Sequence, residues 1–276
     1  MFRLQDSLPA REAELLQSLR AWFAQQDAVC VAYSGGVDST LVAAIAHEQK
    51  GDGALAVTGV SPALAPHLLE EARSQAAWIG IRHQECTTCE LADPAYSSNP
   101  IDRCFACKRE LHRHLQPIAA AAGAAQVIDG VNLDDLGDHR PGIEAARLAG
   151  VRSPLAEAGI DKAAIRRLSQ ALGFPWWDKP AQPCLSSRFP YGESISAERL
   201  KRVGQAEAWL LSHGFSRVRV RCQGLSARIE IPRDRLLDLM QLNEREPLVS
   251  TMLGLGFTSV SLDLEGLVSG KLNREI

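Results

Sequence analysis

The sequence lacks the features that are typical of membrane, secreted and nucleic-acid-binding proteins. No apolar run approaches the roughly 20 residues that span a bilayer, and the polar start, MFRLQDSLPAREAELLQSLR, contains no hydrophobic signal core. The formal net charge is only −3, so the composition provides no broad positive surface for nucleic acid. We therefore expect a cytoplasmic protein with no membrane partner and no nucleic-acid partner.

Common nucleotide and metal motifs are also missing. The chain contains neither GxxxxGK[ST] nor GxGxxG, which argues against kinase-like phosphate loops and dinucleotide-binding folds, and no two histidines form an HxxxH pair. His112 and His114 lie two residues apart on a predicted helix, and we expect both to be exposed. In a reducing cytosol the seven cysteines are expected to be thiols, metal ligands or catalytic groups rather than a disulfide framework.

The rest of the composition is that of a globular protein with an ordinary core. The chain has 276 residues, of which 46% are hydrophobic and 23% charged, so it can form one large or two modest domains. In its first half, strand-like and helix-like segments alternate, which predicts an α/β domain with a parallel sheet and helices on both faces. The predicted strands are 28–34, 54–60, 81–85 and 125–131, and the predicted helices are 11–23, 39–49, 66–79, 105–122 and 162–172.

A connector rich in tryptophan and proline follows this domain. Its prolines at 175, 180 and 183 interrupt helical continuation, so we place the two domains at residues 1–180 and 181–276.

The second domain is predicted to be a smaller α+β domain of order α-β-β-α-β. Ser196 can cap a helix that ends at Gly214. The segments RVRVRC (217–222) and ARIEI (227–231) alternate strictly, which predicts two half-buried strands.

The most specific motif is YSGGVDST, residues 33–40, between a predicted strand and a predicted helix. A glycine pair there lets backbone N–H groups crowd around an anion, and the helix N-terminus favours negative charge. Hydroxyl groups can donate further bonds, whereas Asp38 suits helix capping or magnesium coordination better than phosphate. The alternative is an ordinary glycine turn. The motif resembles the SGGxDS loop of the ATP pyrophosphatases, which adenylate a substrate oxygen and release pyrophosphate; this implies ATP and Mg²⁺, with cofactor contacts from Ser34, Gly35, Gly36, Asp38, Ser39 and Thr40.

A second polar loop, DGVNLDDLGDHRPG, follows the last predicted strand of the first domain. Its carboxylates can bind magnesium or ribose, and Arg140 can meet a phosphate. We predict that Gly130 and Arg140 contribute to the nucleotide site. A solvated polar loop is the alternative.

Cys184 emerges from the proline-rich connector and is followed by Ser186, Ser187 and Arg188. Hydroxyl groups and a cation favour the thiolate form of a neighbouring cysteine, so Cys184 is a candidate reactive thiol. The alternative is a buried structural cysteine.

Three arginines share one face of the first predicted strand of the second domain. Arg217, Arg219 and Arg221 lie two residues apart, so their charges repel unless a phosphate or carboxylates neutralise them. Glu230, on the neighbouring predicted strand, can neutralise one of them. This face is therefore predicted to recognise a phosphate, with a solvated charged face as the alternative.

Together, SGGVDST, NPIDRCFACK, DHRPG, VRSPL, CLSSRFPYG, RVRVR and ARIE resemble the LarE-type ATP-dependent sulfur transferases from about residue 10 to 272. This resemblance implies adenylation of a carboxylate of pyridinium-3,5-dicarboxylate mononucleotide. Sulfur delivery then gives a thiocarboxylate for the nickel-pincer nucleotide cofactor of lactate racemase. Cys184 matches the family's sulfur-bearing cysteine, and Ser187, Arg219 and Arg221 match positions that hold the substrate phosphate. Glu207, Glu230 and Asp238 match acidic positions that the family links to the site, and we also place Arg188 among the substrate-binding residues.

The family uses two sources of sulfur. One type sacrifices the sulfur of its single cysteine and leaves dehydroalanine, whereas the other adds a C-x-x-C that can hold a [4Fe-4S] cluster with an iron open to external sulfide. This chain has Cys104, Cys107 and Cys184, which matches the cluster type. A zinc ion on three thiolates and a metal-free persulfide relay are the chemical alternatives. The resemblance assigns no role to Cys86 and Cys89, and it implies a sulfide donor and a symmetric homo-oligomer.

Two other functions remain open. A tRNA thiolase of the same ATP-using superfamily can also use three cysteines, but it needs an RNA-binding platform that neither the charge nor any recognisable segment provides. A nucleotide-sensing or iron–sulfur carrier protein would release no pyrophosphate with any acceptor.

Overall fold

A computed structural model describes residues 7–123, 125–137, 141–245, 247–268, 270, 271 and 274, without the side chains of 243–245. The chain forms two compact units. The first comprises Met1–Ser61, His67–Glu90 and Asp102–Gln182, and the second comprises Pro62–Pro66, Leu91–Ile101 and Pro183–Ile276. Two short stretches from the first half of the sequence thus belong to the second unit.

The first unit is built on a four-stranded parallel sheet, as the alternating pattern predicts. Its strand order is β3-β2-β1-β4. The strands are β1 (Val29–Ala32), β2 (Ala54–Val60), β3 (Arg82–Thr87) and β4 (Gln126–Ile128). The helices associated with it are α1 (Ala10–Ala24), α2 (Val37–Lys50), α3 (Pro66–Ile79), α5 (Arg103–Ala121), α6 (Pro141–Leu148), α7 (Pro154–Glu157) and α8 (Lys162–Ala171).

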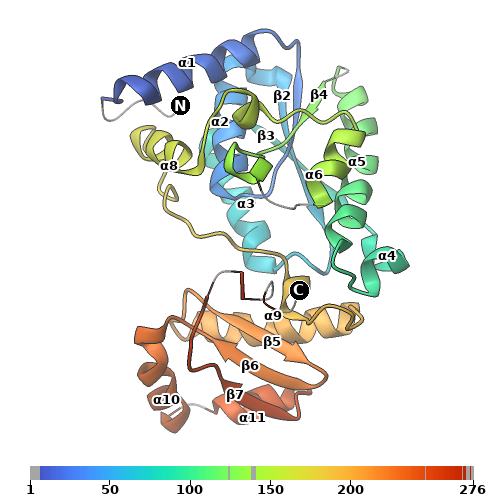
Figure 1. The fold of residues 1–276 in the computed structure, drawn as a ribbon, viewed down its shortest axis with the longest axis vertical. Helices are drawn as coiled ribbons and strands as arrows, with labels where there is room; N and C mark the ends of the chain where they lie inside the picture. The colour runs from blue at the N-terminus through green and yellow to red at the C-terminus, as the bar shows by residue number, and fades with distance from the viewer. Residues whose placement is uncertain are drawn as a thin grey trace. The chain divides into compact units, whose positions relative to one another are not determined.

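Helices cover both faces of this sheet. Val29 and Val31 of β1 pack into a core shared with α1, α2 and α8, whereas Cys30 and Ala32 pack into a second core shared with α5. Figure 1 shows α1 and α8 on one side of the sheet and α5 on the other. A strand that is buried on both faces needs apolar residues at every position, which explains why β1 shows no polar alternation. None of the described helices combines the length and apolar character needed to cross a bilayer.

The strand order places a topological switch at β1. The chain proceeds from β1 through β2 to β3 on one side, and β4 then adds on the other side of β1. Ligands of open α/β sheets bind beyond the strand ends at such a point. The SGGVDST loop directly follows β1, and Gly130 lies two residues beyond β4.

The second unit is an α+β domain. Its main elements are α4 (Pro94–Ser97), the 3₁₀ turn η4 (Leu185–Arg188), α9 (Ala197–Ser212), β5 (Arg219–Gln223), β6 (Ser226–Glu230), α10 (Leu236–Arg245), α11 (Leu248–Gly254) and β7 (Ser259–Leu262). β5 and β6 form an antiparallel hairpin, and β7 pairs in parallel with β6. Two helices connect β6 to β7 where the sequence predicts one. Ser196 caps α9 as predicted, because its hydroxyl accepts a bond from Arg199 N.

The three-stranded sheet has an apolar face and a charged face. Val220, Cys222, Ala227 and Ile229 are all buried, and α9 packs against β5. Arg219 and Glu230 pair across the hairpin, as do Arg221 and Arg228, so these four side chains share the other face. β5 begins at Arg219; Arg217 lies before the strand and is exposed, so its predicted place in the strand is wrong.

Gly130 provides a test of the close approach between β4 and α2. A Cβ at this position would lie 2.8 Å from Ser39 N and 3.0 Å from Ser39 Cα, both rigid parts of the start of α2. We expect Gly130→Ala to displace the SGGVDST loop, to lower the free energy of unfolding by about 1–3 kcal/mol and to weaken ATP binding. Gly137→Ala is the control, because no atom of the described residues lies within 4 Å of its added Cβ. Urea unfolding and ATP titration measure the effects; equal behaviour of the two variants would contradict the packing argument.

Candidate functional site

The loop after β1 leaves the N-terminus of α2 open to an anion. Gly35 has a φ of 67°, and a Cβ there would meet the backbone of Ala72 at 3.0 Å, so only glycine suits the position. Gly36 is the N-cap residue and provides no side-chain capping bond. The first N–H groups of this 14-residue helix therefore point into the loop, which is the arrangement that binds phosphate in other proteins.

The loop hydroxyls have different surroundings. Ser34 Oγ and Ser39 Oγ lie 3.1 Å apart, and Ser39 Oγ also donates to Gly36 O, so both serines shape the loop itself. Thr40 is fully buried and donates to Gln75 Oε1 on α3 at 3.0 Å. The two serine hydroxyls lie in the loop, whereas that of Thr40 is directed into the core; the contacts of all three with the nucleotide stay a prediction.

Asp38 forms an ion pair with a lysine that the sequence analysis missed. Both carboxylate oxygens of Asp38 lie 2.6 Å from Lys162 Nζ, and because Gly36 is the N-cap residue of α2, Asp38 does not cap this helix. The backbone N–H of Lys162 donates to Asp134 Oδ2 at 2.9 Å, which brings a second carboxylate close to the loop. The SGGVDST motif contains no cation of its own, and α8 supplies one. No local pattern could reveal this pair, because the two residues are 124 positions apart.

A second lysine holds the loop in place. Lys179 Nζ donates to Gly35 O at 3.2 Å and pairs with Glu71 of α3. Lys179 lies in the connector five residues before Cys184. The connector that leads to Cys184 is therefore attached, at Lys179, to the SGGVDST loop of the first unit.

Cys104 and Cys107 lie in the first turns of α5, three residues apart, so they share one face of the helix. Cys104 is exposed and Cys107 is partly buried.

Gly142 of α6 packs close to Lys108 and Cys104, since a Cβ there would lie 3.0 Å from Lys108 Cγ. Lys108 also faces buried Asp129: burial raises the pKa of the Asp129 carboxyl, while a bond from Ser153, the Val131 N–H and the Lys108 charge oppose this shift. Arg140, predicted to meet a phosphate, lies outside the described residues.

A buried ion pair determines the conformation of the Cys184 loop. Arg188 donates two hydrogen bonds to Glu207 of α9, at 2.7 and 2.9 Å, and both side chains are more than nine-tenths buried. Arg188 Nη1 also donates to Pro183 O, Cys184 O and Ser187 Oγ. Cys184 itself is exposed at the start of η4. The pair therefore presents the thiol at the surface of a rigid turn.

The same network reaches the arginines of β5. Glu207 Oε1 accepts a bond from Val220 N at 2.8 Å, and Arg221 donates to Ser187 O at 2.6 Å. Glu230 is fully buried and neutralises Arg221, with Oε1 3.1 Å from Arg221 Nε. The prediction that Glu230 neutralises one of these arginines is confirmed.

Arg219 differs from its neighbours because its guanidinium forms no ion pair or hydrogen bond with another described residue. Burial lowers the pKa of its guanidinium, and the nearby charges of Arg188 and Arg221 lower it further, while Glu230 and Glu207 oppose them. A bound anion would therefore stabilise the charged form of Arg219 more than that of a neighbouring arginine that a glutamate already neutralises.

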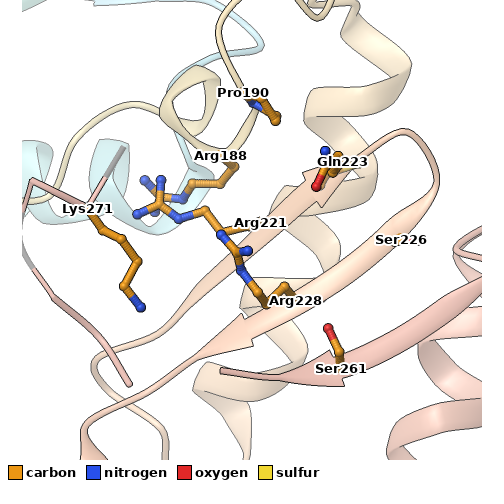
Figure 2. Close-up of a pocket in the computed structure, with 9 residues that line it drawn as sticks. Arg188, Pro190, Arg221, Gln223, Ser226, Arg228, Ser261 and Lys271 are labelled. Atoms are coloured by element: carbon orange, nitrogen blue, oxygen red, sulfur yellow. The ribbon is translucent and has the colours of Figure 1, made fainter. Parts of the chain in front are cut away.

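A pocket of about 140 Å³ lies on the charged side of the sheet in the second unit. Figure 2 shows Arg188, Arg221, Arg228 and Lys271 around it, with Ser261 of β7 at its edge. Lys271 Nζ lies 2.9 Å from Asp263, and Arg228 lies 3.5 Å from the same carboxylate. The sequence analysis missed Arg228, Ser261 and Lys271 as lining residues.

Asp238 lies on exposed α10 and forms an ion pair with Arg235; its predicted role at the substrate site stays a prediction.

Other predicted features have mixed outcomes. Cys30 and Cys222 are packing thiols as expected, and burial raises the pKa of Cys30 to about 12. Cys86 is buried and Cys89 exposed, and Cys89 N donates to Glu110. The expectation that His112 is exposed is wrong: it is 2% exposed, and burial lowers its pKa to about 4.

No group of three metal-binding side chains (His, Cys, Asp or Glu) is formed by the described residues. Cys104 and Cys107 belong to the first unit, whereas Cys184 belongs to the second. The three-cysteine cluster therefore stays a prediction.

A parallel sheet whose central strand ends in an SGGxDS loop defines the PP-loop class of ATP pyrophosphatases. The fold is similar to that of NMN synthetase from Francisella tularensis, with a TM-score of 0.50 and 19% identity over 62% of this chain and 75% of that one. No family model matches the chain.

Two curated relatives cover almost the whole chain. An uncharacterized protein of Synechocystis sp. is 55% identical over 259 residues, 94% of this chain and 97% of the relative. Pyridinium-3,5-bisthiocarboxylic acid mononucleotide synthase of Lactiplantibacillus plantarum is 38% identical over 269 residues, 97% of this chain and 95% of the relative. The chain belongs to the family of this synthase, the LarE-type ATP-dependent sulfur transferases.

Lys162 offers a direct test of the nucleotide site. Without its charge, Asp38 would repel the triphosphate, so we expect Lys162→Gln to weaken ATP binding about tenfold when Mg²⁺ is absent. The loss should be smaller with Mg²⁺, which can neutralise Asp38 in place of the lysine. Arg166→Gln, on an exposed position of the same helix, is the control. Calorimetric titration of ATP with and without Mg²⁺ measures the difference, and unchanged affinity in Lys162→Gln would exclude a role for this lysine.

Proposed function

We propose that the protein uses ATP to adenylate a carboxylate of pyridinium-3,5-dicarboxylate mononucleotide and then replaces the adenylate with sulfur. The product is a thiocarboxylate for a nickel-pincer nucleotide cofactor. In the first step a carboxylate oxygen attacks the α-phosphate and pyrophosphate leaves; in the second, sulfur attacks the activated carbonyl and AMP leaves. The observation that carries the proposal is the 38% identity over 97% of the chain with the Lactiplantibacillus plantarum synthase.

The first unit suits the ATP half of this reaction. The open N-terminus of α2 can receive the phosphates, and Lys162 provides a positive charge beside them. Asp38 and Asp134 supply the carboxylate oxygens that Mg²⁺ prefers, and the phosphates would complete its coordination. Bound Mg²⁺ would neutralise charge that develops as pyrophosphate leaves.

The second unit suits the substrate half. Arg219 is a partly buried cation without a carboxylate partner among the described side chains, and the family places the substrate phosphate at this position, at Arg221 and at Ser187. Arg221 is already neutralised by Glu230, so it would attract the phosphate less strongly, but it could donate a hydrogen bond to it from a fixed position. We assign Arg188 and Glu207 to positioning: their donors and acceptors are used on each other, on the Cys184 loop and on β5.

The cysteines have the character that a [4Fe-4S] cluster requires. Cys104 and Cys107 share one helix face, and Cys104 and Cys184 are exposed. When bound, such a cluster would leave one iron open to sulfide from an external donor. We propose that these three thiols hold it, with sacrifice of the Cys184 sulfur as the alternative source. The family also leads us to propose a symmetric homo-oligomer.

Covalent connections support this assignment. The five residues from Lys179 to Cys184 span at most about 18 Å when fully extended, and Lys179 is bonded to Gly35 of the nucleotide loop. The chain itself therefore limits the distance between the Cα atoms of Lys179 and Cys184 to about 18 Å.

Iron analysis tests the sulfur source. We expect anaerobically reconstituted protein to show brown cluster absorbance with roughly four irons per chain. Replacement of Cys104, Cys107 or Cys184 by Ala should abolish this absorbance, whereas Cys89→Ala, also at an exposed position, should retain it. Stoichiometric zinc without iron would favour the zinc site, and absence of any metal would favour the sacrificial route or the metal-free persulfide relay.

Substrate binding tests the arginine assignment. Removing Arg219 should weaken binding of the phosphorylated mononucleotide about tenfold to a hundredfold, since a charge-assisted phosphate contact is lost, and should leave ATP binding unchanged. Arg217→Ala is the matched control, because Arg217 lies two residues away and is exposed. Separate titrations of the two ligands would measure this. Equal loss of ATP affinity in Arg219→Ala would argue against its assignment to the substrate phosphate.

A further inference from the structure

The segment Leu91–Ile101, here named the 91–101 segment, leaves the first unit and packs into the second. It lies between Glu90 and Asp102, which both belong to the first unit. Asp93 caps the short helix α4 by accepting a bond from Ala95 N. The segment ends three residues before Cys104, the first cysteine of the C-x-x-C.

Two side chains of this segment bind the Cys184 loop. Tyr96 Oη and Ser186 Oγ form a 2.6 Å hydrogen bond, and both residues are almost completely buried. Asn99 Nδ2 donates to Pro190 O at 2.7 Å, and Asn99 O accepts a bond from Gly192 N at 2.9 Å. All of these contacts lie within the second unit.

Asn99 adopts a conformation that is unusual for its residue type. Among the described residues it is the one non-glycine residue with a positive φ, 57°, and it is fully buried. Asparagine tolerates this region better than most side chains, but the conformation still costs energy, so surrounding contacts must hold it. Its N–H donates to Tyr96 O within the segment, and its side-chain amide and carbonyl oxygen bind the chain that follows the Cys184 turn.

We propose that Tyr96 and Asn99 are positioning residues that limit how far the C-x-x-C can move from Cys184. This inference rests on the proposed cluster, because it assigns these residues to the assembly of its three ligands. Cys104 and Cys184 are about 80 residues apart along the chain, but only about 10 residues separate them by way of the Tyr96–Ser186 bond. Loss of this bond would lengthen the chain that is free to move between the cysteines, and the entropic cost of bringing two chain points together rises with that length.

Cross-linking of thiols tests this without any metal. Cys30, Cys86 and Cys222 are buried, so in a Cys89→Ser background the accessible thiols are Cys104, Cys107 and Cys184. A short bismaleimide should join Cys184 to the C-x-x-C, and peptide mass spectrometry gives the rate. We expect Tyr96→Phe and Asn99→Gly, which removes the amide but tolerates the backbone conformation, to slow this reaction about fivefold or more.

Ser98→Ala is the matched control. It removes an exposed bond to Pro94 O in the same segment and leaves the contacts to the Cys184 loop intact. ATP titration and thermal melting of each variant identify protein that remains folded. Unchanged cross-linking in folded Tyr96→Phe and Asn99→Gly overturns the inference. Slower cross-linking in the two variants supports the inference even when the parent protein takes up no iron. Failure to take up iron counts only against the proposed cluster.

Discussion

The buried pair of Arg188 and Glu207 is the interaction on which the second unit depends. Two hydrogen bonds join the side chains, Glu207 also receives the N–H of Val220, and Arg188 also holds the carbonyl of Cys184. One ion pair thus connects α9, the first residues of β5 and the turn that carries the thiol. Loss of one partner would leave a buried charge without compensation, at a cost of about 3–5 kcal/mol.

This pair explains why neighbouring arginines have different tasks. Arg188 and Arg221 are each neutralised by a buried glutamate and serve as rigid donors, whereas Arg219 has no carboxylate bonded to it in the described chain. The first unit shows the same division. Lys162 neutralises Asp38 beside the open helix terminus, and Lys179 holds the loop backbone at Gly35. Under the proposed function, these fixed charges would lie beside the anionic parts of the substrates.

The local features of the fold could be predicted from the sequence. Apolar runs without alternation predicted β1 and β2, the glycine pair predicted the loop at the end of β1, and Ser196 predicted the start of α9. These signals depend on neighbouring residues. The contacts that complete the candidate site depend on residues far apart: Lys162 meets Asp38 across 124 positions, and Tyr96 meets Ser186 across 90. The burial of His112 was missed for the same reason, because periodicity on α5 does not reveal what packs against each face.

We propose that sulfide from outside the protein, and not the sulfur of Cys184, reaches the ATP-activated carboxylate, so that one chain can act repeatedly. The most direct measurement supplies ATP, Mg²⁺, the dicarboxylated pyridinium mononucleotide and excess sulfide to anaerobically reconstituted protein, and counts thiocarboxylate formed per chain. We expect many products per chain, release of AMP and pyrophosphate in equal amounts, and an unchanged mass of the Cys184 peptide. A single product per chain, with that peptide lighter by one hydrogen sulfide, would contradict it.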